Sequence, residues 1–194
     1  MGTMDQYTRY ETLFGDGALQ WRDGLVVSHC PPGTAGARIA VQGALAPTTG
    51  DARRLTGMLQ AYFAGERVEF TAAGLPIDWG AGSPFQQRVA RALAAIPFGE
   101  TVTYAGLAIL AGRPGAARAV GNFMAANPLP VLLPCHRVIR ADGGWGRYSA
   151  GADYKRRLLR MEAAVRDTRV PSGRRPRTAG SREYHPAPIG PEAR

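Results

Sequence analysis

The sequence predicts an α/β N-terminal domain, with a small antiparallel sheet and a helix, followed by a mainly α, winged-helix-like domain that contains a helix-turn-helix. Three observations lead to this fold class. Short apolar runs flank a hairpin signal within residues 1–80, capped amphipathic helices fill residues 81–165, and a stretch rich in Gly and Pro, 74–82, lies between them. Residues 166–194 hold seven arginines, three acidic residues and five prolines, so we expect a disordered basic tail there.

In the first domain the residues favour a hairpin, further strands and one helix. Residues 18–21 and 25–27 flank Arg22-Asp23-Gly24, which is typical of a hairpin turn. Residues 38–41 are predicted as a third strand, and 67–70 are compatible with a returning strand. The helix should begin at an Asp51 cap and end at Gly65, and its apolar face is Leu55, Met58, Leu59 and Tyr62.

In the second domain the helix signals are clearer. Ser83 and Pro84 cap a helix, whose inner stripe is Phe85, Val89, Leu93 and Ile96. Thr103 should cap a short helix over 104–111, and residues 112–115 form a turn into a third helix over 116–126. Two short helices joined by a turn that contains Gly predict a helix-turn-helix. A last helix over 153–165 has a stripe made of Tyr154, Leu158, Met161 and Val165, with Glu162 beside it.

Composition limits the class of protein. The 194 residues have 45% hydrophobic content, no apolar run long enough for a membrane span and no signal-peptide pattern at the N-terminus, so we expect a cytoplasmic protein. Cys30 and Cys135 lie far apart without CxxC spacing, which argues against a zinc site or a disulfide framework. Cys30 follows His29 and precedes two prolines, where packing at a strand end is the favoured interpretation. A net charge of +9 favours a polyanionic partner such as nucleic acid, although an arginine-rich proteome is the alternative.

The stretch from Leu132 to Ile139 carries the strongest chemical signal. It sets Cys135 beside His136 and Arg137, between two apolar runs that are typical of buried strands. A thiol becomes a good nucleophile as the thiolate, and a neighbouring base or cation promotes that form. Pro134 disfavours a regular strand, so a backbone turn could bring the thiol and the imidazole into one site. The alternative is a buried structural cysteine.

Two other segments are candidate binding elements. The third predicted helix presents small residues and a single long cationic side chain, Arg118, which suits close approach to DNA; a tight helix–helix contact is the alternative. Residues 141–148 form a glycine-rich loop with two aromatic residues, and such a loop could enclose a flat ligand or form a surface hairpin.

Several motifs together resemble the O6-alkylguanine-DNA alkyltransferase family. The string Pro134-Cys135-His136-Arg137-Val138 is highly specific, and it follows Asn127-Pro128 and the run from Gly115 to Gly121 in the family's order. The resemblance covers about residues 84–163 and is supported by residues 96–100, 103–104, Leu158-Leu159 and Glu162. The N-terminal half resembles the family only in size, loop-rich strands and the helix end at 61–65.

The resemblance implies irreversible transfer of an alkyl group from guanine O6 in double-stranded DNA to Cys135, with no cofactor or metal, by a monomer that acts once. His136 would take the thiol proton through a water, Glu162 would orient the imidazole and Tyr104 would protonate the departing guanine. Asn127 would brace the active-site turn. Arg118 would fill the gap left by the flipped nucleotide, on a DNA-binding helix that also presents Ala117, Ala119 and Gly121. The implied base pocket comprises Met124, Val138, Trp145, Tyr148 and Ser149.

The sequence departs from the family pattern in places. Ala150 stands where a glycine is expected, and Trp145 and Arg147 add bulk nearby, which affects the range of alkyl groups. Zinc cysteines are not visible in the N-terminal half, and the basic tail lies outside the family core. Three other functions remain open: a lesion-binding relative without an acceptor, which Cys135 argues against; a helix-turn-helix transcription factor, for which one arginine among alanines offers too few base-reading side chains; and a thiol hydrolase, which requires turnover.

Overall fold

The computed structural model describes residues 5–40, 49–70, 74–78, 82–146 and 148–167. The chain divides into two compact units, the first comprising Met1–Gly80 with Pro128–Leu132 and the second Ala81–Asn127 with Leu133–Arg194. The main division falls inside the Gly- and Pro-rich connection. The sequence did not predict that Pro128–Leu132, from the middle of the second half, packs with the first unit.

The first unit is built on a three-stranded antiparallel sheet in the order β1-β2-β3. Its strands are β1 (Gln6–Thr12), β2 (Gly15–Arg22) and β3 (Leu25–Cys30). The predicted hairpin between β2 and β3 is confirmed, and its turn residues Asp23 and Gly24 both have positive φ, 50° and 78°, as tight hairpin turns require. Strand β1 was not predicted. It pairs with β2 over its full length, and Tyr10 crosses Gly17 so closely that a Cβ there would lie 2.3 Å from the tyrosine ring.

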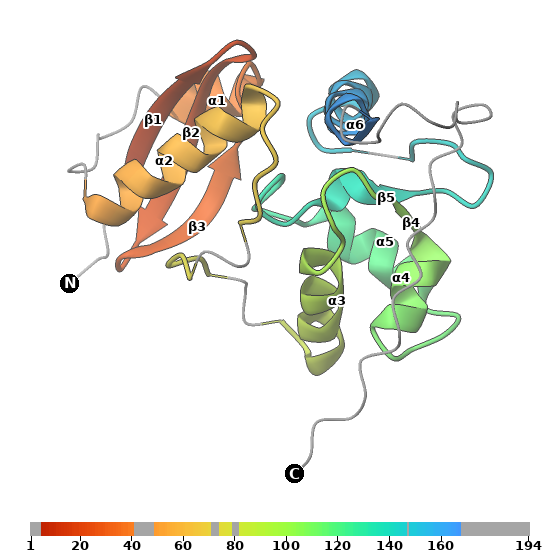
Figure 1. The fold of residues 1–194 in the computed structure, drawn as a ribbon. Helices are drawn as coiled ribbons and strands as arrows, with labels where there is room; N and C mark the ends of the chain where they lie inside the picture. Colours follow the sequence, from red (N-terminus) through yellow and green to blue (C-terminus); the bar gives the residue numbers. More distant parts are fainter. Residues whose placement is uncertain (1–4, 41–48, 71–73, 79–81, 147, 168–194) are drawn as a thin grey trace. The chain divides into compact units, whose positions relative to one another are not determined.

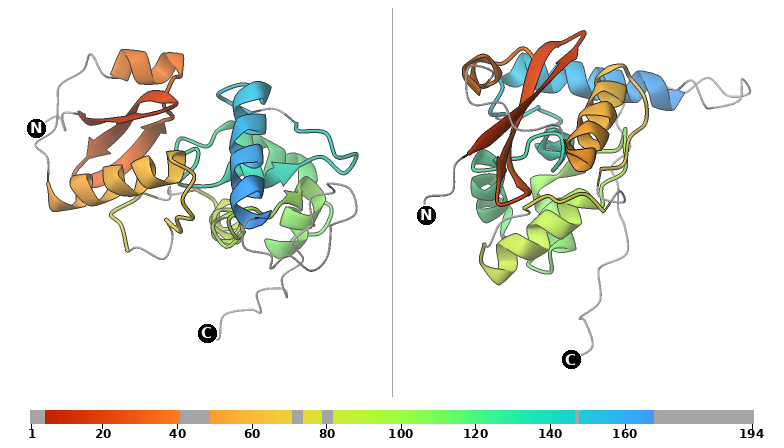
Figure 2. Two further views of the ribbon diagram at one scale, coloured as in Figure 1. Left: turned by 45° about the horizontal axis from the view of Figure 1, so that its top comes forward. Right: turned by 90° about the vertical axis from the view of Figure 1, so that its left-hand side faces the viewer.

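Two helices complete the first unit (Figures 1 and 2). Helix α1 (Ala35–Ala40) packs against β2 and β3, and α2 (Gly50–Phe63) packs against β1. The strand predicted over residues 38–41 is wrong, because Thr34 caps a helical turn there by accepting from the Ala37 N–H at 3.3 Å. Residue 41 lies outside the described residues.

Helix α2 has the predicted apolar face but a different cap. Thr49, two residues before Asp51, is the N-cap, and its hydroxyl accepts from the Ala52 N–H at 3.2 Å. Leu55, Leu59 and Tyr62 are fully buried, and Gly65, with φ 91°, reverses the chain after the helix. Residues 67–70 are not a strand.

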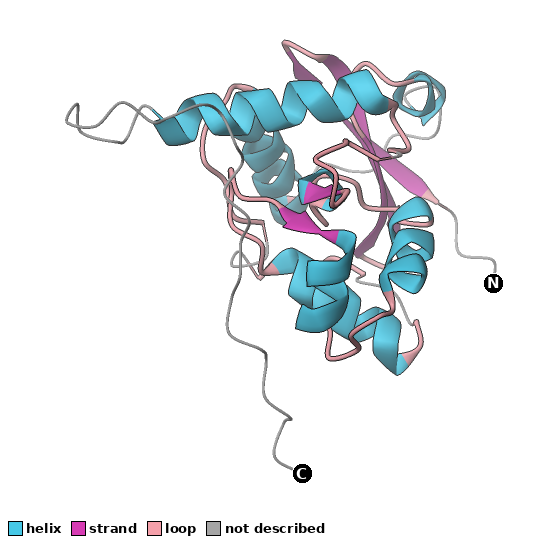
Figure 3. Cartoon of the chain, turned by 90° about the vertical axis from the view of Figure 1, so that its right-hand side faces the viewer, coloured by secondary structure: helices cyan, strands magenta, loops and turns pink. Residues whose placement is uncertain are grey.

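The second unit consists of helices around a two-stranded parallel sheet (Figure 3). Helix α3 (Pro84–Ala94) begins with the predicted Ser83 cap, completed by Gln86 as a capping box. Helix α4 (Tyr104–Leu110) has the predicted Thr103 cap and is followed by α5 (Ala117–Ala125), and all three helices pack together. Strands β4 (Val102–Thr103) and β5 (Val138–Ile139) pair beside them.

Helix α6 (Ala152–Asp167) closes the second unit and packs against the turn that carries Cys135. It continues past Val165, so the predicted start of the tail at residue 166 falls inside the helix. The buried stripe also differs from the predicted one. It consists of Lys155, Leu158, Leu159 and Glu162, whereas Tyr154, Met161 and Val165 are half-buried. Residues 168–194, most of the predicted tail, lie outside the described residues.

Candidate active site

Cys135 opens a single 3-10 turn, Cys135–Arg137, directly after Pro134. The Cys135 N–H donates to the Leu133 carbonyl at 2.7 Å, and the Arg137 N–H donates to the Pro134 carbonyl at 2.9 Å. The backbone turn predicted at Pro134 is therefore confirmed. The apolar run before Pro134 is not the buried strand that was predicted; the run after it is β5.

Asn127 holds the thiol and its turn from the end of α5. Its Nδ2 donates to the Leu133 carbonyl at 3.1 Å and to Cys135 Sγ at 3.0 Å. Both acceptors are buried, so the amide orientation is fixed by the two bonds it makes. The bond from Asn127 to Cys135 Sγ therefore closes a loop between two residues that are eight positions apart in the sequence.

The Cys135 thiol is 5% exposed, and this burial dominates its chemistry. Burial raises the pKa of Cys135 to about 11, against the Asn127 hydrogen bond and the Lys155 charge, which lower it. The group is therefore a thiol at neutral pH, and a base must take its proton before it can act as a nucleophile. Arg137, predicted to assist the thiol with its charge, is instead bonded to Glu162.

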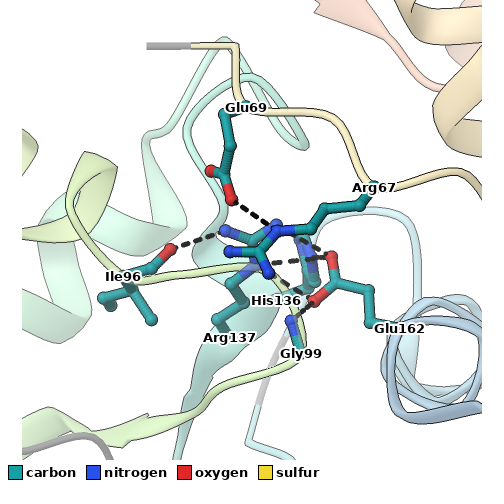
Figure 4. A network of polar contacts seen from close by, with 7 residues as sticks. All are labelled: Arg67, Glu69, Ile96, Gly99, His136, Arg137 and Glu162. Carbon is teal, nitrogen blue, oxygen red and sulfur yellow. Dashed lines mark hydrogen bonds and ion pairs between the residues drawn. The ribbon is translucent and has the colours of Figure 1, made fainter. Parts of the chain in front are cut away.

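His136, Arg137 and Glu162 form a buried network (Figure 4). His136 Nε2 lies 2.8 Å from Glu162 Oε1, and Arg137 donates to the same carboxylate through Nε and Nη2 at 3.0 to 3.3 Å. The Gly99 N–H donates to Glu162 Oε2 at 2.9 Å, and Arg137 Nη1 donates to the Ile96 carbonyl at 2.6 Å. The loop between α3 and β4 therefore helps to fix Glu162 and Arg137, and through Glu162 the imidazole of His136.

The titration of this network follows from its contacts. Burial opposes ionisation of Glu162, but its contacts with His136 and Arg137 outweigh the effect of burial and hold the pKa of Glu162 well below its usual range. Burial lowers the pKa of His136, although the Glu162 carboxylate works in the opposite direction. His136 is therefore a neutral base at physiological pH, held by an ionised carboxylate through Nε2. Nδ1 is the ring nitrogen that does not face Glu162.

Lys155 is a site residue that the sequence reasoning missed. Its side chain is fully buried, and Nζ donates to the Val138 carbonyl at 2.5 Å. Burial lowers the pKa of Lys155 to about 8, and ionisation of Cys135 acts in the opposite direction. The available signal was spacing: Lys155 and Glu162 are seven residues apart on a helix, which places both on one face.

The residues of the predicted base pocket differ in burial. Val138 and Met124 are buried, whereas Trp145 is 40% exposed and Ser149 is exposed. The Tyr148 hydroxyl is buried without a hydrogen-bond partner among the described residues, and its ring stacks on Tyr154. Arg147 lies outside the described residues.

Tyr104, at the start of α4, is half-buried. Burial raises its pKa, and ionisation of Cys135 raises it further, so the hydroxyl keeps its proton at neutral pH. The glycine-rich loop passes directly over this hydroxyl, because a Cβ at Gly146 would lie 2.9 Å from it. Gly146 also has φ 67°, so a side chain there would be both strained and obstructed.

Helix α5 presents the predicted small-residue surface. Arg118 and Ala119 are exposed, Ala117 and Gly121 are half-buried, and Val120 and Met124 face inward. No Cβ contact would form at Gly121, so the helix surface there is open. Arg118 is thus a long cation on an otherwise nearly bare helix face.

Among the described residues no group of three or more His, Cys, Asp or Glu side chains could hold a metal ion. Within the same ranges, no helix has both the length and the apolar character that a membrane crossing needs.

Residues 84–164 match the family model described as "6-O-methylguanine DNA methyltransferase, DNA binding domain". Relatives named methylated-DNA--protein-cysteine methyltransferase include one from Mycobacterium leprae, 45% identical over 116 residues, which are 60% of this chain and 68% of the relative. A Mycobacterium bovis relative is 49% identical over 104 residues, 54% of this chain and 61% of its own length. The match therefore spans less than two thirds of that relative.

Solved structures extend the similarity over most of the chain. The crystal structure of Mycobacterium tuberculosis O6-methylguanine methyltransferase matches with a TM-score of 0.69 and 34% identity, covering 88% of this chain and 97% of that one. The same organism's OGT in complex with DNA matches with a TM-score of 0.69 and 35% identity, covering 82% and 94%. Both units of the chain are needed for such coverage. The chain belongs to the O6-methylguanine-DNA methyltransferase family.

Proposed function

We propose that this chain repairs DNA by transferring an alkyl group from O6 of guanine to Sγ of Cys135, once per molecule. The observation that carries the proposal is the buried Cys135 thiol, which accepts a hydrogen bond from Asn127 and is followed in the same turn by His136, the partner of Glu162 on α6. Similarity to an OGT solved with DNA supports double-stranded DNA as the partner.

The transfer is a displacement at carbon. Sγ forms a bond to the alkyl carbon while the bond from that carbon to O6 breaks, and the electron pair of that bond goes to the guanine. The thiol proton passes through a water to His136 Nδ1, since Nε2 is bonded to the Glu162 carboxylate. Tyr104 donates a proton to the departing guanine; His136 then releases the thiol proton to water, and Tyr104 takes up a proton from water, so both side chains return to their starting states. The products are a thioether at Cys135 and an unmodified guanine, so a second turnover has no acceptor.

The raised thiol pKa fits a single-use acceptor. A thiol whose pKa is about 11 reacts slowly with stray electrophiles at neutral pH, because little thiolate is present. Proton removal by His136 then restricts strong nucleophilicity to the moment when the substrate is seated. Burial of Cys135 thus protects an acceptor that is used only once.

DNA binding is assigned to α4 and α5 as a helix-turn-helix, with α5 against the duplex. The O6 alkyl group of a stacked guanine cannot reach a buried thiol, so the nucleotide must flip out of the helix. The small side chains of Ala117, Ala119 and Gly121 allow close approach, and Arg118 occupies the vacated space. Met124, Val138, Trp145, Tyr148 and Ser149 form the proposed pocket for the flipped base.

Intact-mass measurement tests this function. After mixing with an oligonucleotide that contains O6-methylguanine, the protein should gain one methylene unit at Cys135, and Cys135→Ser should abolish the gain. An unchanged mass for the wild-type protein contradicts the proposal, and repeated turnover of the oligonucleotide would indicate a different chemistry.

A further inference from the structure

His29 is a fully buried histidine of the first unit that the proposed chemistry does not use. It lies on β3, is 2% exposed, and makes three hydrogen bonds. Its backbone N–H donates to the Pro128 carbonyl at 2.8 Å, and its Nδ1 lies 2.5 Å from the Pro130 carbonyl. Its Nε2 lies 2.6 Å from the Tyr10 hydroxyl.

The partners of His29 define its tautomer. A carbonyl oxygen only accepts, so Nδ1 carries the proton and donates to Pro130. Burial lowers the pKa of His29 to about 4, so the ring is neutral and Nε2 accepts from the Tyr10 hydroxyl. Every polar atom of the side chain is therefore used, and only one ring orientation satisfies both bonds.

The segment that His29 bonds to, Pro128–Leu132 (the clamped segment), has an unusual backbone. Pro128 and Pro130 have no N–H, so the segment cannot pair with the edge strand β3 as a regular strand would. Its bonds to His29 are made through the carbonyls of these two prolines. Val131, directly after the clamped Pro130, has φ 76° and is 1% exposed. A β-branched residue rarely adopts this left-handed conformation, which persists where surrounding contacts hold it.

The clamped segment is also the chain that joins two parts of the candidate site. Pro128 follows Asn127, which bonds to Leu133 and to the thiol, and Leu132 precedes the turn of Cys135. The loop from Asn127 to Cys135 is thus closed at its ends in the second unit, while its middle belongs to the first unit. A shift of the middle must pass along the covalent chain to Asn127, to Cys135, or to both.

We infer that His29 is a positioning residue for Cys135: by clamping the carbonyls of Pro128 and Pro130 it holds the strained turn at Val131 and so fixes the geometry between Asn127 and the thiol. The inference rests on the proposed function for its biological meaning. Under this inference a residue of the first unit positions the nucleophile, although all the proposed reacting side chains belong to the second unit.

A matched pair of variants tests the clamp. The amide nitrogen of Asn falls near the place of His Nδ1, so His29→Asn can keep the donor to Pro130, whereas His29→Gln places its amide near Nε2 and loses that donor. Tyr10→Phe is the control, since it removes the Tyr10 bond and leaves the Pro130 bond in place. Two rates are measured for each protein: transfer from free O6-benzylguanine, and peptide-resolved alkylation of Cys135 by iodoacetamide across pH.

We expect His29→Gln to slow the O6-benzylguanine reaction about tenfold or more, because small misplacements of reacting groups cost that much. The pH profile of iodoacetamide alkylation should shift upward, because the Asn127–Sγ bond that lowers the thiol pKa is weakened. His29→Asn and Tyr10→Phe should stay within about threefold of wild type. Cys30, on β3, reports on the first unit in the same digest, and its alkylation should not change in Tyr10→Phe.

A further variant separates positioning from simple stability. Glycine adopts the conformation of Val131 without strain, so Val131→Gly in the His29→Gln background should recover part of the rate. A wild-type rate in His29→Gln overturns the inference, as does equal loss in Tyr10→Phe or in a folded His29→Asn. A His29→Gln protein that does not fold, with or without Val131→Gly, also overturns it in favour of a purely structural role. Iodoacetamide needs no guanine, so a shifted profile would support the clamp even if wild-type protein failed to accept an alkyl group from O6-methylguanine.

Discussion

At the scale of single residues, the site depends on where its buried charges lie. Glu162 is a fully buried carboxylate that accepts from His136, Arg137 and Gly99. Removing one partner of such a network leaves an unpaired buried charge, which costs about 3–5 kcal/mol. Arg137 is therefore best understood as the charge that keeps Glu162 ionised, and Glu162 as the group that orients His136. The cation that acts on the thiol is Lys155.

Lys155 gives a prediction with a defined pH dependence. Lys155→Met should raise the pKa of the Cys135 thiol and slow its alkylation by iodoacetamide at pH 7 about three- to tenfold, since half to one pKa unit changes the thiolate fraction by that factor. The wild-type lysine loses its proton near its pKa of about 8, so the difference between the proteins should shrink as the pH rises through that value.

The matched control for Lys155 is Arg160→Met, which removes an exposed cation from the same helix. Peptide-resolved alkylation rates from pH 6.5 to 9.5 provide the measurement. Equal slowing in the two variants would mean that net charge, rather than the buried ammonium, governs the thiol.

At the scale of elements, helix α5 combines two tasks. Its outer face carries Arg118, while its C-terminal end leads into Asn127, which bonds to the thiol. The helix proposed to contact DNA is thus directly continuous with the residue that bonds to the thiol. The proposed base flipping and the proposed alkyl transfer can be tested separately at this element.

Arg118→Ala should slow repair of O6-methylguanine in duplex DNA far more than it slows reaction with free O6-benzylguanine. Only the duplex requires unstacking, which costs a few kcal/mol, so a loss of about a hundredfold on the duplex is expected. Second-order rates on both substrates, with Arg113→Ala as an exposed cation on the preceding turn for comparison, provide the test. Equal losses on the two substrates would identify Arg118 as a structural residue.

The sequence was most informative where capping and local chemistry agree. Ser83 and Thr103 predicted their helices, and Pro134 predicted the turn at Cys135. Residues 38–41 were wrongly predicted as a strand because isolated Ile and Val favour strands. The Thr34 hydroxyl lies before these residues and caps a helix over Ala35–Ala40.

The site was predictable in its motif residues and not in its long-range partners. Cys135, His136 and Glu162 carry a motif, but nothing local distinguishes Lys155 from a surface lysine until its face of α6 is known to be buried. The clamp of His29 joins residues 101 positions apart, and no periodicity in either segment encodes it. Such contacts arise from tertiary packing alone.

At the scale of the whole molecule, the buried His29 should make stability depend on acid. Its pKa is about 4 in the folded protein and about 6.5 when unfolded, so the unfolded chain binds more protons between these values. Stability is therefore lost as the pH falls from 6.5 toward 4, by up to about 3 kcal/mol from this group. Urea unfolding across this range should show a shallower pH dependence in His29→Asn, which cannot titrate. An identical dependence in the two proteins would show that His136, or another group, accounts for the acid sensitivity.

The C-terminal segment after α6 is a candidate for additional contacts with DNA phosphates. Residues 168–194 contain six arginines and two acidic residues, a large part of the net charge of +9, yet they carry no motif of the chemistry. Arginines that contact phosphates release counterions, so each contact adds about 0.9 to the slope of log affinity against log salt. Deleting 168–194 should therefore weaken duplex affinity at low salt and flatten that slope. The reaction with free O6-benzylguanine should not change, because the deletion leaves Cys135, Asn127, His136, Lys155 and Glu162 in place. Fluorescence anisotropy with an undamaged duplex at several salt concentrations measures the slope, and an unaltered slope would mean that the segment makes no contact with DNA.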